Sequence, residues 1–141
     1  MGGQTNFIER HGVWDDEQRR LAEEIKRRIE ADGLRYVRLA WGDAHGYSRA
    51  KTLTVPAFVS ALSQGYNIGV ATTTLDSAGA RVFASFTRGG GMGLGEMTGS
   101  PNLTIVPDPA TFRTLPWAPS ASAAIPRSGQ GSARTATPSP D

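Results

Sequence analysis

The segment from Leu75 to Gly79, with the sequence LDSAG, holds residue types that could do chemistry. A serine between glycines, on a sharp turn from a strand into a helix, is typical of a hydrolase nucleophile. Here Leu75 stands where the first glycine would be, and both flanking segments are predicted strands. The spacing therefore does not predict a serine hydrolase. Asp76 and Ser77 are also explained by a hairpin turn, in which Asp and Gly are favoured.

Two histidines and a glycine-rich stretch are the other candidates for binding chemistry. His11 and His45 are separated by a predicted helix and a predicted strand, and no carboxylate stands at helical spacing that would make a metal cluster with them. The glycines between residues 89 and 99 give G-x-G-x-G, which lacks the spacing of a dinucleotide-binding turn and the G-K-[ST] of a P-loop. We expect both histidines at surface or loop positions and residues 89–99 to form a mobile loop.

Composition limits the classes to which this chain can belong. Its 141 residues favour one domain, and its 17 Gly and 9 Pro predict that part of it does not fold. The lack of cysteine excludes disulfides, thiolate catalysis and zinc-thiolate sites. A net charge of +2 gives no indication of a nucleic-acid partner. No apolar run resembles a secretory signal or a membrane span, so we expect a cytoplasmic chain.

Hydrophobic periodicity predicts the elements that position these residues. Leu21, Ile25 and Ile29 recur at every fourth position and predict an amphipathic helix over residues 15–31, with a capping box of Asp15 and Gln18. A second helix is predicted from Pro56, because proline is well tolerated in the first helical turn, to Gln64. Alternating or β-branched segments predict about five strands. These strands are predicted at 34–41, 51–55, 68–75, 81–87 and 103–106.

The predicted fold class is α+β, with one sheet crossed by the second helix. We expect three parts: a lead with the amphipathic helix over residues 1–33, a domain over residues 34–117, and a disordered tail over residues 118–141. The tail is rich in Ala, Ser and Pro and has one large aliphatic residue, Ile125. Such a segment cannot bury enough apolar surface to offset the entropy of ordering it.

Three segments together resemble the N-terminal β-grasp domain of the glutamine synthetase family. They are WGDAHGYSRAKTLTV from Trp41 to Val55, the helix from Pro56 to Gly65, and VPDPATFRTLPW from Val106 to Trp117. The resemblance covers about 84 residues, starting at Leu34. It implies a β-grasp sheet for residues 34–117.

The resemblance implies an ATP-dependent ligase that activates the γ-carboxylate of glutamate as an acyl phosphate, which ammonia or an amine then displaces. ATP and Mg or Mn are the implied cofactors of the full-length enzyme, and the implied partners are subunits of a homo-oligomer, without nucleic acid or membrane. In the family, the metal ligands and the ATP site lie in a large C-terminal domain. We expect no cofactor-binding or metal-binding residue in this chain.

The resemblance also implies a role for the LDSAG segment. In typical family members a loop carries an acidic residue and serines into the active site of the neighbouring subunit. Asp76 and Ser77 are the counterparts here, and the charge of Asp76 would help to bind or deprotonate the incoming amine. The match also fits branches that join glutamate to polyamines or other amines, such as γ-glutamyl-polyamine synthetases.

The resemblance ends at Pro119, where the composition changes sharply. A shifted reading frame in a GC-rich gene would give this change, and a short paralogue with a disordered tail is the alternative. We therefore expect a fragment, truncated before the catalytic domain and inactive alone. The alternative function is a non-catalytic interaction module, in which an exposed strand edge or the leading helix binds a partner.

Overall fold

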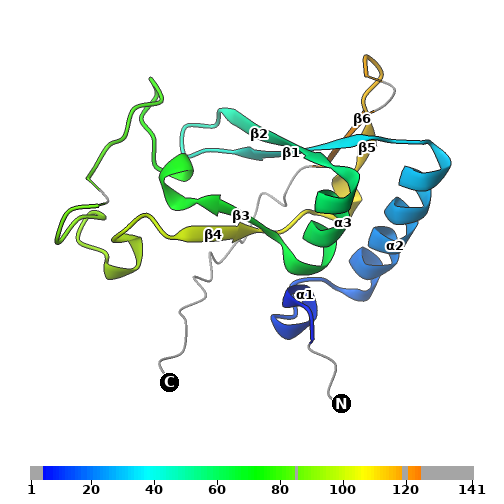
Figure 1. The fold of residues 1–141 in the computed structure, drawn as a ribbon, viewed down its shortest axis with the longest axis horizontal. Helices are drawn as coiled ribbons and strands as arrows, with labels where there is room; N and C mark the ends of the chain where they lie inside the picture. The colour runs from blue at the N-terminus through cyan, green and yellow to red at the C-terminus, as the bar shows by residue number, and fades with distance from the viewer. Residues whose placement is uncertain (1–4, 85, 119–120, 125–141) are drawn as a thin grey trace.

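The computed structural model describes residues 5–84, 86–118 and 121–124 and confirms the α+β class (Figure 1). The strands of the described residues lie in two sheets, one of four strands in the order β2-β1-β6-β5 and one formed by β3 and β4. The sequence predicts one sheet of about five strands, whereas the structure divides its strands between these two sheets. The helices are α1 (Phe7–Arg10), α2 (Asp16–Ala31) and α3 (Val55–Gln64). The strands are β1 (Tyr36–Gly42), β2 (Ser48–Thr54), β3 (Tyr66–Gly69), β4 (Asn102–Ile105), β5 (Arg113–Thr114) and β6 (Ala121–Ala124).

The first hairpin forms where the alternating pattern predicts it. β1 and β2 pair antiparallel from Tyr36 opposite Thr54 to Gly42 opposite Ser48. Val37, Leu39 and Trp41 of β1 are buried, and the residues between them are exposed or half-buried. Successive side chains of a strand point to opposite faces, so this alternation gives β1 one face against the core.

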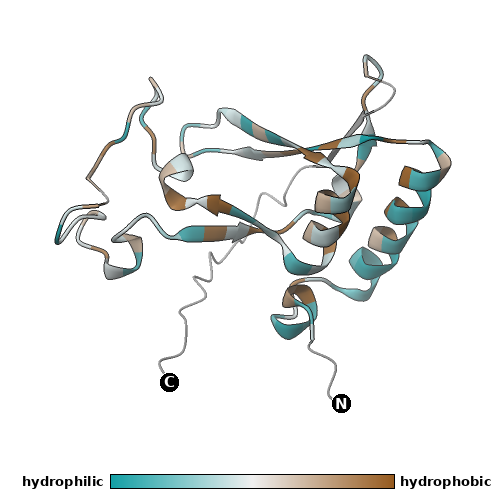
Figure 2. Cartoon of the chain, viewed as in Figure 1, coloured by the Kyte–Doolittle hydropathy of each residue, from teal (hydrophilic) through white to brown (hydrophobic). Residues whose placement is uncertain are grey.

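Helix α2 packs on the body of the molecule through a narrow apolar stripe. The capping box between Asp15 and Gln18 is present, as predicted. Ile25 and Ile29 are buried in the same cluster as Phe58 of α3, whereas Leu21 is only half-buried. The outward faces of α2 are charged, and Figure 2 shows this helix as mostly hydrophilic and α3 as more apolar. The leading helix therefore belongs to the main core.

Residues 106–112 anchor the start of α2. The indole nitrogen of Trp14 donates to the carbonyl oxygen of Pro107 at 3.2 Å, and the side-chain amide of Gln18 donates to Asp108 at 3.3 Å. Pro107 and Asp108 are both buried, and Phe112 lies in the core beside Phe58, with ring centroids 6.1 Å apart. The proline-rich segment thus holds the leading helix against the fold.

Helix α3 ends at Gly65, where the chain turns directly into β3. Gly65 has φ +68° and ψ −178°, a conformation that is essentially restricted to glycine. A Cβ atom there would lie 2.4 Å from the side chain of Thr104 on β4. Glycine is therefore required both by the backbone and by the close approach of β4.

Two of the predicted strands differ from the structure. Of the strand expected over 68–75, only Ile68 and Gly69 lie in β3, and Val70–Thr73 forms a 3-10 helix. The hydroxyls of Thr72 and Thr73 donate to carbonyl oxygens three residues earlier, at 2.8 and 2.7 Å. Threonine side chains can compete with a sheet in this way for backbone hydrogen bonds.

The strand predicted over 81–87 is wrong for the described part of that segment. Only an isolated bridge between Leu75 and Arg81 forms there, and bends and turns follow. Val82 and Phe86 are 55% and 71% exposed. A strand propensity takes effect only where a neighbouring strand and a buried face are available, and the described residues provide neither.

Part of the segment expected to be a disordered tail forms a strand. Ala121–Ala124 make up β6, which pairs parallel with β1 from Tyr36 to Leu39 and antiparallel with β5. The rest of that prediction, for residues 119–120 and 125–141, lies outside the described residues. None of the helices in the described ranges is long and apolar enough to cross a membrane.

Candidate functional site

The predicted site residues Asp76 and Ser77 lie in a tight turn over residues 75–81, which we call the Asp76 turn. Asp76 Oδ1 accepts hydrogen bonds from the backbone amides of Ala78, at 2.9 Å, and Ala80, at 2.8 Å. The amide of Asp76 donates to the carbonyl oxygen of Ala80 at 2.9 Å, and the bridge between Leu75 and Arg81 closes the turn. The aspartate therefore has the turn-forming role that the simple interpretation gives it.

The same turn leaves one carboxylate oxygen available. Asp76 is partly exposed, and both turn hydrogen bonds go to its Oδ1. Within the described part of the chain, Oδ2 accepts no hydrogen bond and forms no ion pair. Ser77 beside it is exposed. A turn-forming role and a ligand-binding role are thus compatible, because they use different oxygens.

A second aspartate organises the loop between β1 and β2. Asp43 Oδ1 accepts the backbone amides of His45 and Tyr47, both at 2.9 Å. Asp43 Oδ2 forms an ion pair with Arg49, whose Nε and Nη2 both lie at 2.9 Å. The Asp43 side chain is only 2% exposed. We call residues 43–49 the Asp43 loop, and its carboxylate is fully used in holding it together.

The charge state of Asp43 follows from these contacts. Burial of the carboxylate opposes ionisation and would raise its pKa. The amides of Tyr47 and His45 and the guanidinium of Arg49 favour the ionised form more strongly. The pKa of Asp43 therefore lies below its usual value, and this carboxylate stays charged for structural reasons.

His45 brings the Asp43 loop and the Asp76 turn together. Its Nε2 lies 3.0 Å from the carbonyl oxygen of Leu75, the residue before Asp76. His45 lies in an exposed loop, as predicted. Its contact with Leu75, which is 30 residues further along the chain, was not predicted. No local pattern encodes such a contact, because helix α3 and strand β3 lie between the two partners.

The remaining histidine, His11, follows helix α1 and is exposed, as predicted. Its ring packs against Phe7, with centroids 4.4 Å apart. In the described ranges no three His, Cys, Asp or Glu side chains are grouped so that they could hold a metal ion. These residues therefore do not provide a ligand set that fits catalytic Mg or Mn.

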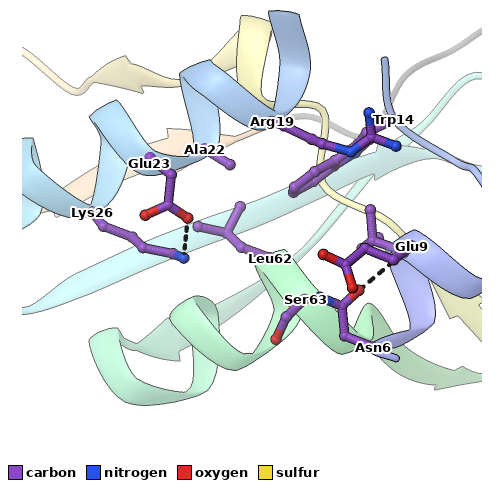
Figure 3. A pocket seen from close by; sticks show the side chains of 10 residues that line it. Asn6, Glu9, Trp14, Arg19, Ala22, Glu23, Lys26, Leu62 and Ser63 are labelled. Carbon is purple, nitrogen blue, oxygen red and sulfur yellow. Dashed lines mark hydrogen bonds and ion pairs between the residues drawn. The ribbon is translucent and has the colours of Figure 1, made fainter. Parts of the chain in front are cut away.

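A pocket of about 150 Å³ opens where α1, α2 and α3 meet (Figure 3). Its charged side chains are largely neutralised, since Lys26 pairs with Glu23 and Arg19 pairs with Asp16 outside the pocket. The pocket shares none of its residues with the Asp43 loop or the Asp76 turn. It is lined by Asn6, Ile8, Glu9, Trp14, Arg19, Ala22, Glu23, Lys26, Leu62 and Ser63.

The glycine-rich segment is a succession of tight turns with one short 3-10 helix, Gly95–Met97. The hydroxyl of Thr98 donates to the carbonyl oxygen of Gly90, and a Cβ atom at Gly91 would lie 2.7 Å from the backbone of Met97. These glycines allow close packing of the loop on itself. Large apolar side chains remain exposed, with Met92 at 64% and Leu94 at 51%.

Comparison with known proteins identifies a sequence relative. No protein-family model matches the chain. The chain is 38% identical over 121 residues to gamma-glutamylanilide synthase from Acinetobacter sp.. This alignment covers 84% of the chain. The predicted resemblance to the glutamine synthetase family is confirmed. The chain spans only 24% of the length of that relative.

Two solved structures resemble this chain. A GmaS/ADP complex matches with a TM-score of 0.50 and 19% identity, over 75% of this chain and 19% of that one. Apo GmaS without ligand has a TM-score of 0.49 and 19% identity, over 70% and 19% of the two chains. The first of these likenesses shows that the chain shares its fold with part of that protein.

Proposed function

We propose that this chain is part of an ATP-dependent ligase that joins the γ-carboxylate of glutamate to ammonia or an amine. The observation that carries the proposal is the 38% identity to gamma-glutamylanilide synthase over 84% of the chain. An anilide is the amide of an aromatic amine, so aniline is the first amine to test beside ammonium and polyamines.

Within that ligase, Asp76 is the residue that meets the amine. Its Oδ2 is free to face a ligand, while Oδ1 holds the turn. A carboxylate in this position binds an ammonium group by charge and hydrogen bonding and accepts the proton that the nitrogen must lose before attack. A neutral amine such as aniline instead donates an N–H hydrogen bond to the carboxylate, which takes the proton as the nitrogen attacks the γ-carbonyl carbon of the acyl phosphate and phosphate leaves. Ser77, exposed beside it, is available as a second polar contact.

This turn serves the active site of a neighbouring subunit in a homo-oligomer. Val82 and Phe86, which follow the turn, and Met92 and Leu94 in the glycine-rich segment are all more than half exposed. Exposed apolar side chains of this size are typical of surfaces that a partner covers. As the resemblance to the glutamine synthetase family implies, ATP and its Mg or Mn ions would bind in other parts of the full-length enzyme.

The test is ATP-dependent phosphate release by the purified 141-residue chain, with glutamate and ammonium, spermidine or aniline. We expect no turnover. Turnover that Asp76→Ala abolishes would contradict the proposal that catalysis requires further parts of the enzyme, whereas turnover insensitive to this change would indicate a contaminating full-length ligase.

A non-catalytic interaction module is the second candidate, and one observation favours it. In the described structure β2 pairs only with β1, so its outer edge is open to another strand. However, Arg49 and Lys51 lie on β2, and charged side chains on an edge strand oppose pairing. The apolar face of the leading helix is packed in the core and is not available to a partner, which leaves only its charged outward face. Native mass spectrometry with gamma-glutamylanilide synthase distinguishes the two, because only the ligase proposal predicts mixed oligomers.

A further inference from the structure

One hydrogen bond joins the Asp43 loop to the Asp76 turn, residues 75–81. His45 Nε2 is 3.0 Å from the carbonyl oxygen of Leu75, and because a carbonyl can only accept, Nε2 carries the proton. We propose that His45 is a positioning residue, which fixes the Asp76 turn, and with it the Asp76 carboxylate, to the first hairpin. The inference concerns the placement of the turn and rests on the proposed function only for its consequence in amine binding.

His45 is suited to this task because its own backbone is held in place. Its amide donates to Asp43 Oδ1, and the other oxygen of Asp43 is paired with Arg49 at the start of β2. The Asp43 carboxylate is almost entirely buried. A continuous series of contacts therefore runs from the sheet through Arg49, Asp43 and His45 to Leu75.

The turn has little else to hold it. Its other hydrogen bonds are internal, between Asp76 and the backbone of Ala78, Gly79 and Ala80. Among the described residues, no second hydrogen bond or ion pair connects residues 75–81 to a distant segment of the fold. Internal bonds define the shape of the turn, but they do not define where it lies. Without His45, no hydrogen bond or ion pair among the described residues would connect the turn to a distant segment.

The test uses ¹⁵N relaxation and imidazole ¹⁵N shifts of the full 141-residue chain. We expect backbone order parameters of about 0.8 for residues 76–80 in the unchanged protein, and values below about 0.6 in His45→Ala. His45→Gln, whose side-chain amide can still donate to Leu75, should recover most of the loss. The neutral His45 ring should give the signature of the Nε2–H tautomer. His11→Ala is the matched control, because it removes the other exposed histidine and should leave residues 76–80 unchanged.

Equal order parameters in His45→Ala and the unchanged protein would overturn the proposal, as would an Nδ1–H tautomer for the neutral ring. Failure of His45→Gln to restore order, while His45→Ala loses it, would also overturn the assignment to this hydrogen bond. His45 is exposed, so loss of folding is not expected, and the dispersion of the amide spectrum verifies it. None of these measurements requires ligase activity, so their outcome is independent of whether the proposed function is correct.

Discussion

At the scale of single residues, two aspartates of the candidate site use their carboxylate oxygens in different ways. Asp43 satisfies both of its oxygens inside the loop that it organises. Asp76 builds its turn with Oδ1 and keeps Oδ2 free of protein partners in the described structure. This difference assigns Asp43 to structure and makes Asp76 the candidate for binding.

The two roles of Asp76 can be separated by substitution. Asp76→Asn keeps an oxygen that can accept both turn amides but removes the charge, whereas Asp76→Ala removes both. We expect amide hydrogen exchange at Ala78 and Ala80 to be nearly unchanged in Asp76→Asn and at least about tenfold faster in Asp76→Ala, since a lost hydrogen bond of this kind is worth about 1–2 kcal/mol. Equal exchange in both variants would show that the side chain does not form the turn.

Asp43 predicts how stability changes in acid. Because its pKa in the folded state lies below the ordinary value of about 3.9, the unfolded chain binds more protons in this range. The contribution of Asp43 is therefore complete above about pH 4 and is lost as the pH falls through the lower folded value. Melting temperatures measured between about pH 5 and pH 2 should fall more steeply for the unchanged protein than for Asp43→Asn. Parallel curves would contradict this account of the Asp43 loop.

At the scale of elements, the sequence predicts features that are determined locally. The α2 helix, its capping box and the β1–β2 hairpin follow from periodicity and end signals within each segment, and all are present. The failure of residues 81–87 to form the predicted strand could not be foreseen, because strand formation depends on a partner that neighbouring residues do not reveal. The contact between His45 and Leu75 could not be predicted either, since it depends on the path of the chain through α3 and β3.

The end of α3 is sensitive to a single added carbon. Gly65→Ala forces a non-glycine residue into a glycine-only conformation, at a cost of about 1–3 kcal/mol, and places Cβ 2.4 Å from Thr104. We expect a loss of at least about 2 kcal/mol in the free energy of unfolding by denaturant titration. Gly69→Ala is the control, because a Cβ atom there meets nothing within 4 Å. Similar losses in the two variants would contradict the geometry of the α3–β3 junction.

The packing of α2 can be tested in the same way. Ile25 is 4% exposed and lies in the core, so Ile25→Ala should cost about 2–4 kcal/mol. Leu21→Ala, on the half-buried edge of the same helix, should cost clearly less. Urea titrations of both variants measure the difference. Equal costs would mean that α2 is not oriented on the core as described.

At the scale of the whole molecule, the chain spans about a quarter of the length of gamma-glutamylanilide synthase, and the proposed function assigns amine binding to its Asp76 turn. The core of α2, α3 and the first hairpin holds the Asp43 loop, and His45 extends that support to the Asp76 turn. Exposed apolar side chains follow the turn along the chain. Under the proposed function, these side chains would be covered by the neighbouring subunit whose site the turn completes.

The most direct measurement of this account is amide formation by a chimera. Residues 6–117 of this chain would replace the matching segment of gamma-glutamylanilide synthase, and γ-glutamylanilide formation would be followed with and without Asp76→Asn. We predict that the chimera is active and that Asp76→Asn lowers kcat/KM for aniline at least about tenfold, a barrier change of about 1.4 kcal/mol, with the KM for glutamate unchanged. An active chimera whose kcat/KM for aniline is unaffected by Asp76→Asn would contradict the claim that this turn receives the amine.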